Sequence, residues 1–371
     1  MNHSVVGNAL HLPYPDGVAQ ACVTSPPYFG LRNYGTAGQI GLEQTPAAYV
    51  AQIVAAMREV WRVLRDDGTL WLNLGDSYAN DTKWGGTTGG KHVSALHGEP
   101  IGRAKRTTGL KAKDLIGVPW RVAFALQDDG WYLRSAITWC KKAPMPESVR
   151  DRPTSATEMV FLLAKQPHYF YDAEAIAEPS GGANGSSFTS EYDRETKPGL
   201  GMGERKEAAT RNARNFWVLG PAPYAGSHFA TMPPELARRC ILAGTSARGQ
   251  CPKCGAPWTR VVEKGLTAHD GETDSAYEKG TTANRLAKLR QAARERGEEY
   301  TNGRVTTGWA ASCDCHAGDP VPQIVLDPFA GSGTTAMVAL QNGRRAIGTE
   351  LNPAYLRLQD ARTQVTLGLG M

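Results

Sequence analysis

Hydrophobic positions along the chain fall into two patterns, helical spacing and short apolar runs. Apolar side chains at 49–64 recur three and four positions apart, which predicts a helix that ends before Gly68. The apolar run at 69–74 then predicts a strand. Similar patterns predict helices at 118–126 and 233–242 and strands at 21–23, 132–139 and 159–163. Strands that alternate with helices indicate an α/β fold with a doubly wound, mostly parallel sheet.

A strand, a tight turn and a helix follow each other near the end of the chain. Residues 324–326 are apolar, Asp327-Pro328 breaks the run, and 334–341 has the composition of a helix. Gly331 and Gly333 lie in the turn, where glycine lets the backbone approach a ligand and where helix N–H groups attract anionic groups. We therefore expect a cofactor at this turn.

The residues around the turn narrow the choice of cofactor. Gly333 is followed by Thr334-Thr335 with no lysine, which argues against a nucleoside triphosphate loop, and the match to a dinucleotide fingerprint is weak. The next predicted strand, 345–350, ends in Glu350 at the spacing from which a carboxylate binds ribose hydroxyls. Glu350 thus fits an adenosine sugar, the alternative being a solvated charge at a strand end.

A rigid corner follows the first predicted strand, in the sequence Thr24-Ser25-Pro26-Pro27-Tyr28. Two prolines fix the backbone and donate no N–H, so the corner accepts hydrogen bonds. An exocyclic amino group suits it: its protons go to Ser25 and to the Pro26 carbonyl, and the base stacks on Tyr28. In isolation the same residues would fit an ordinary turn with a core tyrosine.

Together the two motifs resemble those of the DNA amino-methyltransferases, which carry a Ser/Asp/Asn-Pro-Pro-Tyr/Phe catalytic motif and an Asp-Pro-Phe-x-Gly-Ser-Gly-Thr motif for S-adenosylmethionine. The catalytic motif comes first here, as in the β group of that family, whose chain is circularly permuted. The resemblance extends over 1–30, 60–80, 115–175, 215–245 and 322–362. It implies a Rossmann-like class I methyltransferase fold.

The resemblance also assigns residues. It implies a catalytic role for Ser25, Pro26, Pro27 and Tyr28, and cofactor contacts for Phe229, Asp327, Phe329, Gly331, Ser332, Gly333, Thr334 and Glu350. The family often has Gly-Asp near the amino terminus, and Gly7-Asn8 stands here, so Asn8 replaces a carboxylate at an expected cofactor contact. Members that methylate cytosine N4 typically read Thr-Ser-Pro-Pro-Tyr, which favours that base over adenine N6.

Length, composition and charge fit an enzyme that acts on DNA in the cytoplasm. The 371 residues are 41% hydrophobic, with no apolar run long enough to span a membrane and no signal peptide. A net charge of +5 permits nucleic acid binding, and the stretch 80–117 is glycine-rich and basic. We expect 80–117 and 180–214 to be flexible insertions that contact double-stranded DNA; a solvated insertion without a partner is the alternative. A cognate restriction endonuclease is a further partner that such an enzyme can have.

Four cysteines form a second chemical feature. Cys251 and Cys254 are spaced as a knuckle with Gly255 after it, and Cys313 and Cys315 follow about sixty residues later. Four thiolates fit a structural Zn²⁺ site, with His316 as an alternative ligand and a redox pair or unliganded thiols as alternative interpretations. Cys22, Cys140 and Cys240 lie in apolar runs and are expected to be packing residues.

These observations predict a domain organisation and leave two rival functions. The catalytic domain takes 1–245 and 317–371, and a zinc-ribbon-like insertion takes 246–316. One rival is an amino-methyltransferase acting on RNA or on a protein glutamine, although a glutamine enzyme more typically has Asn in place of Ser25. The other is a DNA-binding protein without activity, against which the intact motifs argue.

Overall fold

The computed structural model of the chain describes residues 2–31, 33–79, 108–144, 146–179, 210–220, 232–264 and 304–368. The chain divides into two compact units. The first comprises Met1–Asp172, Asn215–Pro257 and Cys315–Met371, and the second comprises Ala173–Arg214 and Trp258–Asp314. Most of the two predicted DNA-contacting insertions and the middle of the cysteine-rich segment lie outside the described residues, and the domain limits given above stay predictions.

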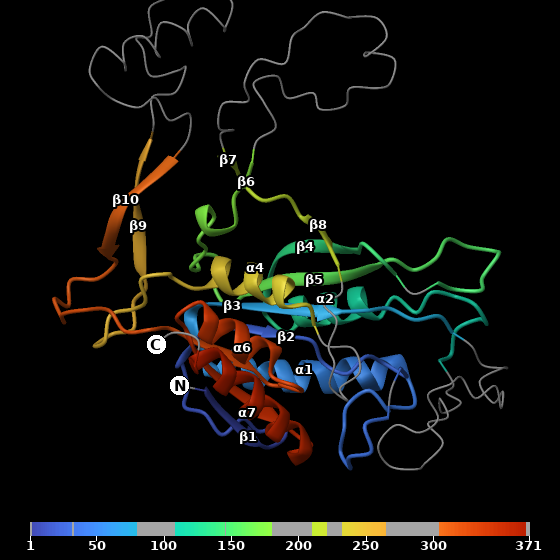
Figure 1. The fold of residues 1–371 in the computed structure, drawn as a ribbon. Helices are drawn as coiled ribbons and strands as arrows, with labels where there is room; N and C mark the ends of the chain where they lie inside the picture. Colours follow the sequence, from blue (N-terminus) through green and yellow to red (C-terminus); the bar gives the residue numbers. More distant parts are fainter. Residues whose placement is uncertain are drawn as a thin grey trace, which may run out of the picture. The chain divides into compact units, whose positions relative to one another are not determined.

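The first unit is built on an eight-stranded sheet (Figure 1). In sheet order its strands are β1 (Asn2–Val6), β12 (Arg345–Glu350), β11 (Ile324–Asp327), β2 (Ala19–Thr24), β3 (Leu64–Leu74), β5 (Thr157–Ala164), β4 (Tyr132–Lys141) and β8 (Phe216–Leu219). Neighbouring strands are parallel except where β5 pairs with β3 and β4. The mostly parallel α/β sheet expected from the sequence is therefore confirmed.

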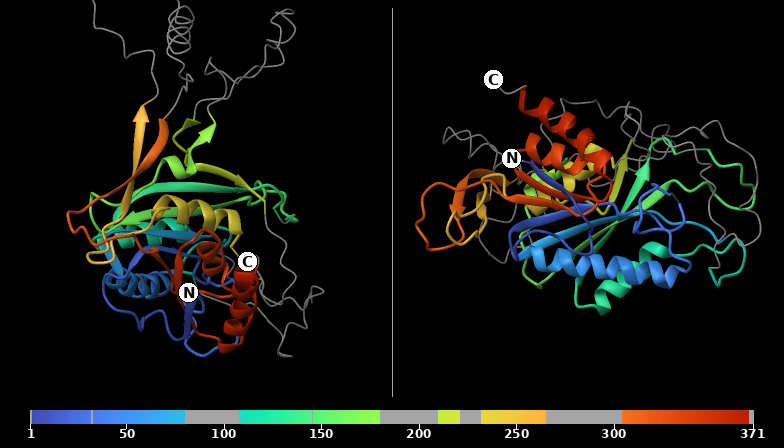
Figure 2. Two further views of the ribbon diagram at one scale, coloured as in Figure 1. Left: turned by 60° about the vertical axis from the view of Figure 1, so that its left-hand side comes forward. Right: turned by 90° about the horizontal axis from the view of Figure 1, so that it is seen from below.

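Helices cover both faces of this sheet (Figure 2). One face carries α1 (Pro46–Val63) and α2 (Val118–Asp128), and the other carries α4 (Pro234–Gly244), α6 (Thr334–Gln341) and α7 (Pro353–Gly368). Because helices lie on both faces, the central strands are buried on both sides: β2 is buried along its whole length. Because β2 and β11 are parallel neighbours inside this sheet, their carboxyl ends lie side by side.

The second unit contains short antiparallel pairs. The hairpin strands β9 (Trp258–Lys264) and β10 (Arg304–Ala311) pair with each other, as do β6 (Glu178–Pro179) and β7 (Thr210–Arg211). A single 3₁₀ turn, η1 (Glu174–Ile176), precedes β6.

Helix α1 shows why the apolar spacing was informative. Thr45 caps its start by accepting from the Ala48 N–H, and Pro46 occupies the first turn, where its missing N–H costs nothing. Tyr49, Ile53 and Met57 are fully buried against the sheet. The helix ends at Val63 and β3 begins at Leu64, five residues before the strand predicted from the sequence. Leu64 has extended backbone and its carbonyl accepts from Lys165 Nζ at 2.9 Å, contacts that the local sequence pattern does not reveal.

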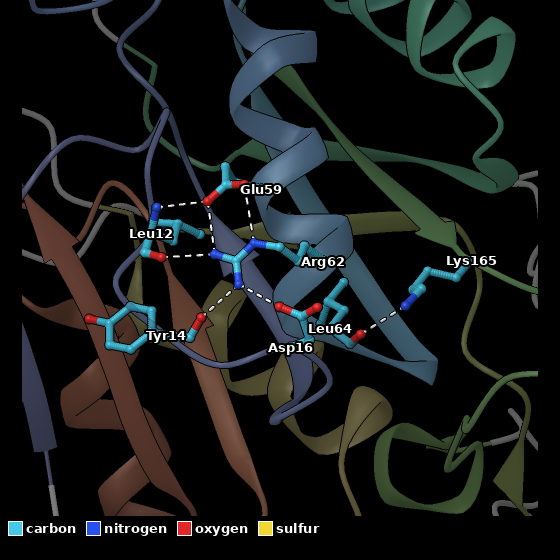
Figure 3. A network of polar contacts seen from close by, with 7 residues as sticks. All are labelled: Leu12, Tyr14, Asp16, Glu59, Arg62, Leu64 and Lys165. Carbon is cyan, nitrogen blue, oxygen red and sulfur yellow. Dashed lines mark hydrogen bonds and ion pairs between the residues drawn. The ribbon is translucent and has the colours of Figure 1, made fainter.

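Arg62, on the last turn of α1, holds the segment that follows β1 (Figure 3). Its guanidinium donates to the carbonyls of Leu12 and Tyr14 at 2.8 Å each and pairs with Glu59 and Asp16 at 2.9 and 2.7 Å. Glu59 in turn accepts from the Leu12 N–H at 2.9 Å. Two carbonyls and a backbone N–H of an irregular segment thus find partners on a helix.

No helix among the described residues is long and apolar enough to cross a membrane.

We expect Arg62→Met to lower the free energy of unfolding by about 2 kcal/mol, because it removes the donor to two carbonyls and the ion-pair partner of Glu59 while keeping the aliphatic packing. Urea denaturation measures the difference. Arg58→Met is the matched control on the same helix, since Arg58 pairs with Asp129 from a side chain that is 67% exposed, and it should change stability little. Equal losses in the two variants would contradict the role given to Arg62.

Candidate active site

The rigid corner predicted at Ser25 to Tyr28 begins where β2 ends. Tyr49 Oη donates to the Pro27 carbonyl at 2.9 Å, which anchors the corner to the buried face of α1. The ring of Tyr28 lies against Gly75, and a Cβ there would come within 2.6 Å of the ring. Glycine at position 75 therefore lets the tyrosine pack beside the end of β3.

The predicted cofactor turn connects β11 to α6. Gly331 and Gly333 have φ values of 50° and 78°, in the left-handed region that favours glycine. A Cβ on Gly333 would also come within 2.8 Å of Gln359 on α7. The residue types that identified this turn in the sequence are thus required by its backbone.

One hydrogen bond brings the two motifs together. Thr24 Oγ1 donates to Asp327 Oδ1 at 2.7 Å across 303 residues of sequence, because β2 and β11 are parallel neighbours with Cys22 opposite Leu326. Thr335 Oγ1 adds a second link by donating to the Val23 carbonyl at 3.1 Å. Asp327 also accepts from the Phe329 N–H at 3.1 Å, and burial raises the pKa of its carboxyl group above the ordinary value.

Glu350, at the end of β12, faces the cofactor turn. One carboxylate oxygen accepts from the Gly331 N–H and the other from the Asn352 N–H, each at 2.8 Å. Burial raises the pKa of this carboxyl group, while the side chain remains half-buried rather than enclosed. A carboxylate has about four acceptor positions, so Glu350 can accept from a hydroxyl group besides these backbone donors.

The other predicted cofactor residues take varied positions. Asn8 follows β1, beside the end of β12, and its side chain caps a turn by accepting from the Leu10 N–H at 3.0 Å. Phe329 is half-buried, and Ser332 and Thr334 are buried. Phe229 lies outside the described residues.

Two residues of α7 support the cofactor turn and were not predicted. Gln359 Nε2 donates to the Gly331 carbonyl at 2.9 Å, and Arg362 Nη1 donates to Ser332 Oγ at 2.7 Å and to Thr334 Oγ1 at 3.2 Å. On a helix whose sequence shows no motif, these two side chains look like ordinary solvated residues, so sequence alone gave no reason to single them out.

A group of polar residues behind the catalytic corner was also missed. Tyr28 Oη donates to Glu158 Oε2 at 2.6 Å, and Asn73 Nδ2 lies 2.7 Å from the same hydroxyl oxygen. Lys141 Nζ pairs with the other oxygen of Glu158 at 2.5 Å. Burial and, after it, the charge of Glu158 raise the pKa of Tyr28 well above its ordinary value, so the phenol keeps its proton. Asn73 left a sequence signal, since it interrupts the apolar run 70–74.

The four predicted metal-ligating cysteines gather in space. The Sγ atoms of Cys251, Cys254, Cys313 and Cys315 lie within 4.8 Å of one another, and His316 is not part of the group. The knuckle is closed by the Gly255 N–H, which donates to the Cys251 carbonyl at 2.9 Å. Arg65 Nη1, on β3, donates to the Cys254 carbonyl at 3.3 Å. Cys22 and Cys240 are buried, as expected for packing residues, and Cys140 is partly exposed.

Comparisons with known proteins agree with this geometry. The family model described as DNA methylase, for N6 and N4 methyltransferases, matches residues 19–250 and 318–361. The type II methyltransferase M.XycI of Xanthomonas campestris pv. cyanopsidis is 37% identical over 94% of this chain and 83% of its own length, and M.Cfr9I of Citrobacter freundii is 36% identical over the same shares.

A solved structure supports the fold. The PvuII DNA methyltransferase, described as cytosine-N4-specific, matches 99% of this chain and 90% of its own with a TM-score of 0.52 at 14% identity. The resemblance inferred from the two motifs is confirmed: the chain belongs to the N6/N4 DNA methylase family and is a DNA methyltransferase.

Proposed function

We propose that this enzyme is a type II methyltransferase of double-stranded DNA that transfers a methyl group from S-adenosylmethionine to N4 of a cytosine. The observation that carries the proposal is the hydrogen bond between Thr24 and Asp327, which sets the amino-group corner beside the cofactor turn. The relatives described as type II methyltransferases support the class of enzyme.

The residues at the turn fit S-adenosylmethionine. Glu350, a half-buried carboxylate beside the turn, is the proposed acceptor for the ribose hydroxyl groups. The contacts proposed for the rest of the donor are Asp327, Phe329, Gly331, Ser332, Gly333 and Thr334, with Asn8 and Phe229 as further proposed contacts. When bound, the donor supplies an electrophilic sulfonium methyl group.

The catalytic corner would hold the target base. A base inside a duplex is out of reach, so the enzyme must rotate it out of the helix into the pocket. Tyr28 stacks on the ring, and Ser25 Oγ and the Pro26 carbonyl accept from its amino group. Accepting both protons draws the nitrogen lone pair out of conjugation and directs it at the methyl group. Positioning and charge placement thus supply the rate enhancement, and no covalent enzyme intermediate is needed.

Cytosine N4 is favoured over adenine N6 by Ser25 at the first position of the motif and by the cytosine-N4 specificity of the PvuII enzyme that shares the fold. Adenine N6 is the second candidate, since the matched family contains both specificities.

We further infer that the chain is circularly permuted. The catalytic corner follows β2, early in the chain, and the cofactor turn follows β11, late in it, although the two strands are neighbours in the sheet. The basic stretch 80–117 and the segment 180–214 are proposed to contact DNA, and a restriction endonuclease of the same specificity is the proposed partner in the cell.

A structural Zn²⁺ ion is proposed at the four cysteines. Tetrahedral coordination with Zn–S bonds near 2.3 Å places the sulfur atoms about 3.8 Å apart, and the Sγ atoms within 4.8 Å of one another are close to that arrangement. The four side chains would hold the ion away from the transferred methyl group, and its contribution would be to stability.

Purified protein incubated with DNA and isotopically labelled S-adenosylmethionine should yield labelled N4-methylcytosine, measured by mass spectrometry of the released nucleosides. Labelled N6-methyladenine instead would mean that the target base is adenine, with the proposed mechanism unchanged. Label found only in RNA or protein would overturn the proposed substrate.

Ser25→Ala and Tyr28→Ala should each lower the methylation rate by at least about 100-fold while cofactor affinity survives, because these side chains are proposed to contact the base and not the cofactor. Glu350→Ala should do the reverse and raise the dissociation constant of S-adenosylmethionine first, by about 10-fold for the loss of charge-assisted hydrogen bonds. Isothermal titration calorimetry and single-turnover rates separate the two effects. Equal loss of cofactor binding in all three variants would count against the division of roles.

Purified protein should contain one Zn²⁺ per chain by inductively coupled plasma mass spectrometry, and Cys251→Ser or Cys254→Ser should lose it. Cys140→Ser is the control, since that cysteine lies outside the group, and it should retain the metal. Metal-free wild-type protein with unchanged thermal stability after zinc addition would overturn the site.

A further inference from the structure

The polar group behind Tyr28 forms a directed chain of hydrogen bonds. Ser25 Oγ donates to Tyr28 Oη at 3.3 Å, and Tyr28 Oη donates to Glu158 Oε2 at 2.6 Å. The Glu158 side chain is only 12% exposed, and its other oxygen is held by Lys141 Nζ at 2.5 Å. As the anionic partner of this ion pair, Glu158 only accepts hydrogen bonds.

The carboxylate decides which way every hydroxyl in the chain points. Because Glu158 cannot donate, the single hydrogen of the Tyr28 hydroxyl must lie toward Glu158. The Tyr28 oxygen is then left as an acceptor, and the hydrogen of Ser25 turns inward to it. Ser25 accordingly presents lone pairs on its outward side, where the amino group of the target base would lie.

Asn73 reinforces the same direction. Its Nδ2 lies 3.0 Å from Glu158 Oε2, 2.7 Å from Tyr28 Oη and 3.3 Å from Ser25 Oγ. Since the carboxylate only accepts, the atom facing it must be the amide nitrogen, which fixes the orientation of the side chain. Asn73 therefore donates to the chain, and its buried Oδ1 has no partner among the described residues.

The antiparallel direction of β5 explains why Glu158 lies near Tyr28. Glu158 stands at the amino end of β5, opposite Trp139 on β4, and Val160 stands opposite Asn73 near the carboxyl end of β3. Because β5 runs against its neighbours, its start rather than its end lies at the catalytic edge of the sheet.

We propose that Glu158, held by Lys141, is a positioning residue that sets the direction of the hydrogen bonds from Ser25 through Tyr28 and so makes Ser25 an acceptor for the exocyclic amino group. This inference rests on the proposed function for its catalytic consequence, whereas the direction of the hydrogen bonds is a property of the protein alone.

The variant Glu158→Gln tests the proposed direction of the hydrogen bonds between Ser25 and Tyr28. Glutamine has nearly the same shape, but its amide can donate to Tyr28 Oη; the tyrosine hydrogen then turns to Ser25, whose own hydrogen turns toward the base. The single-turnover methylation rate should fall on the order of 100-fold, with cofactor affinity and melting temperature unchanged. Glu59→Gln, a carboxylate paired with an arginine on α1 and remote from the corner, is the matched control and should keep the wild-type rate.

A double-mutant cycle separates positioning from a general structural effect. If Glu158 acts through the Tyr28 hydroxyl, Glu158→Gln should have no further effect in a Tyr28→Phe background, where that hydroxyl is absent. Additive losses in the double variant would overturn the proposal.

An NMR measurement that does not depend on enzymatic activity tests the direction of the hydrogen bonds independently of the proposed function. In protein labelled with ¹³Cζ-tyrosine, one of the 13 tyrosine resonances belongs to Tyr28 and is identified by its loss in Tyr28→Phe. This resonance should shift in Glu158→Gln and stay in place in Glu59→Gln, and should move back in Glu158→Asp, which restores an acceptor. An unmoved resonance in Glu158→Gln overturns the proposed direction even if the enzyme methylates cytosine, and a shifted one supports it even if the substrate proves different.

Discussion

Thr24 and Asp327 are both buried, and the hydrogen bond between them joins the carboxyl ends of two parallel strands at the centre of the sheet. A carboxyl group in such a place is costly unless donors surround it, and Thr24 and the Phe329 N–H supply them. Thr24 and Asp327 are the first residues of the two motifs, so this contact helps to set the separation of the corner at 25–28 from the turn that follows β11. The glycines of the turn and the residues Gln359 and Arg362 of α7 then stabilise the conformation of the turn itself.

The sequence predicted those parts of the site that depend on local backbone geometry. The prolines at 26 and 27 and the glycines at 331 and 333 identify turns by residue type, because proline fixes φ and lacks an N–H, and glycine alone readily takes the positive φ of this turn. The helical spacing at 49–64 was equally informative, since a fully buried helix face needs it. The polar residues at 65–68, between the predicted helix and the predicted strand, carry no such requirement, which is why the start of β3 at Leu64 was placed too late.

Residues that act across distant segments were not predictable in the same way. Glu158 and Lys141 come from β5 and β4, and nothing near either of them in sequence shows that Glu158 contacts both Lys141 and Tyr28. Their meeting depends on the antiparallel insertion of β5, a feature of topology rather than of composition. Arg362 and Gln359 are similar cases, because their function is set by the packing of α7 on the cofactor turn.

The strand order also has a consequence for how the molecule is made. In the described sheet β1 pairs only with β12, and β11 lies between β12 and β2, so two interior strands are synthesised after the other six. Until they emerge from the ribosome, β2 lacks one neighbour and β1 has no strand to pair with, and contacts of such large sequence separation form slowly. Until β11 and β12 are made, the growing chain therefore carries the corner at 25–28 without the turn that is the proposed binding site of the methyl donor.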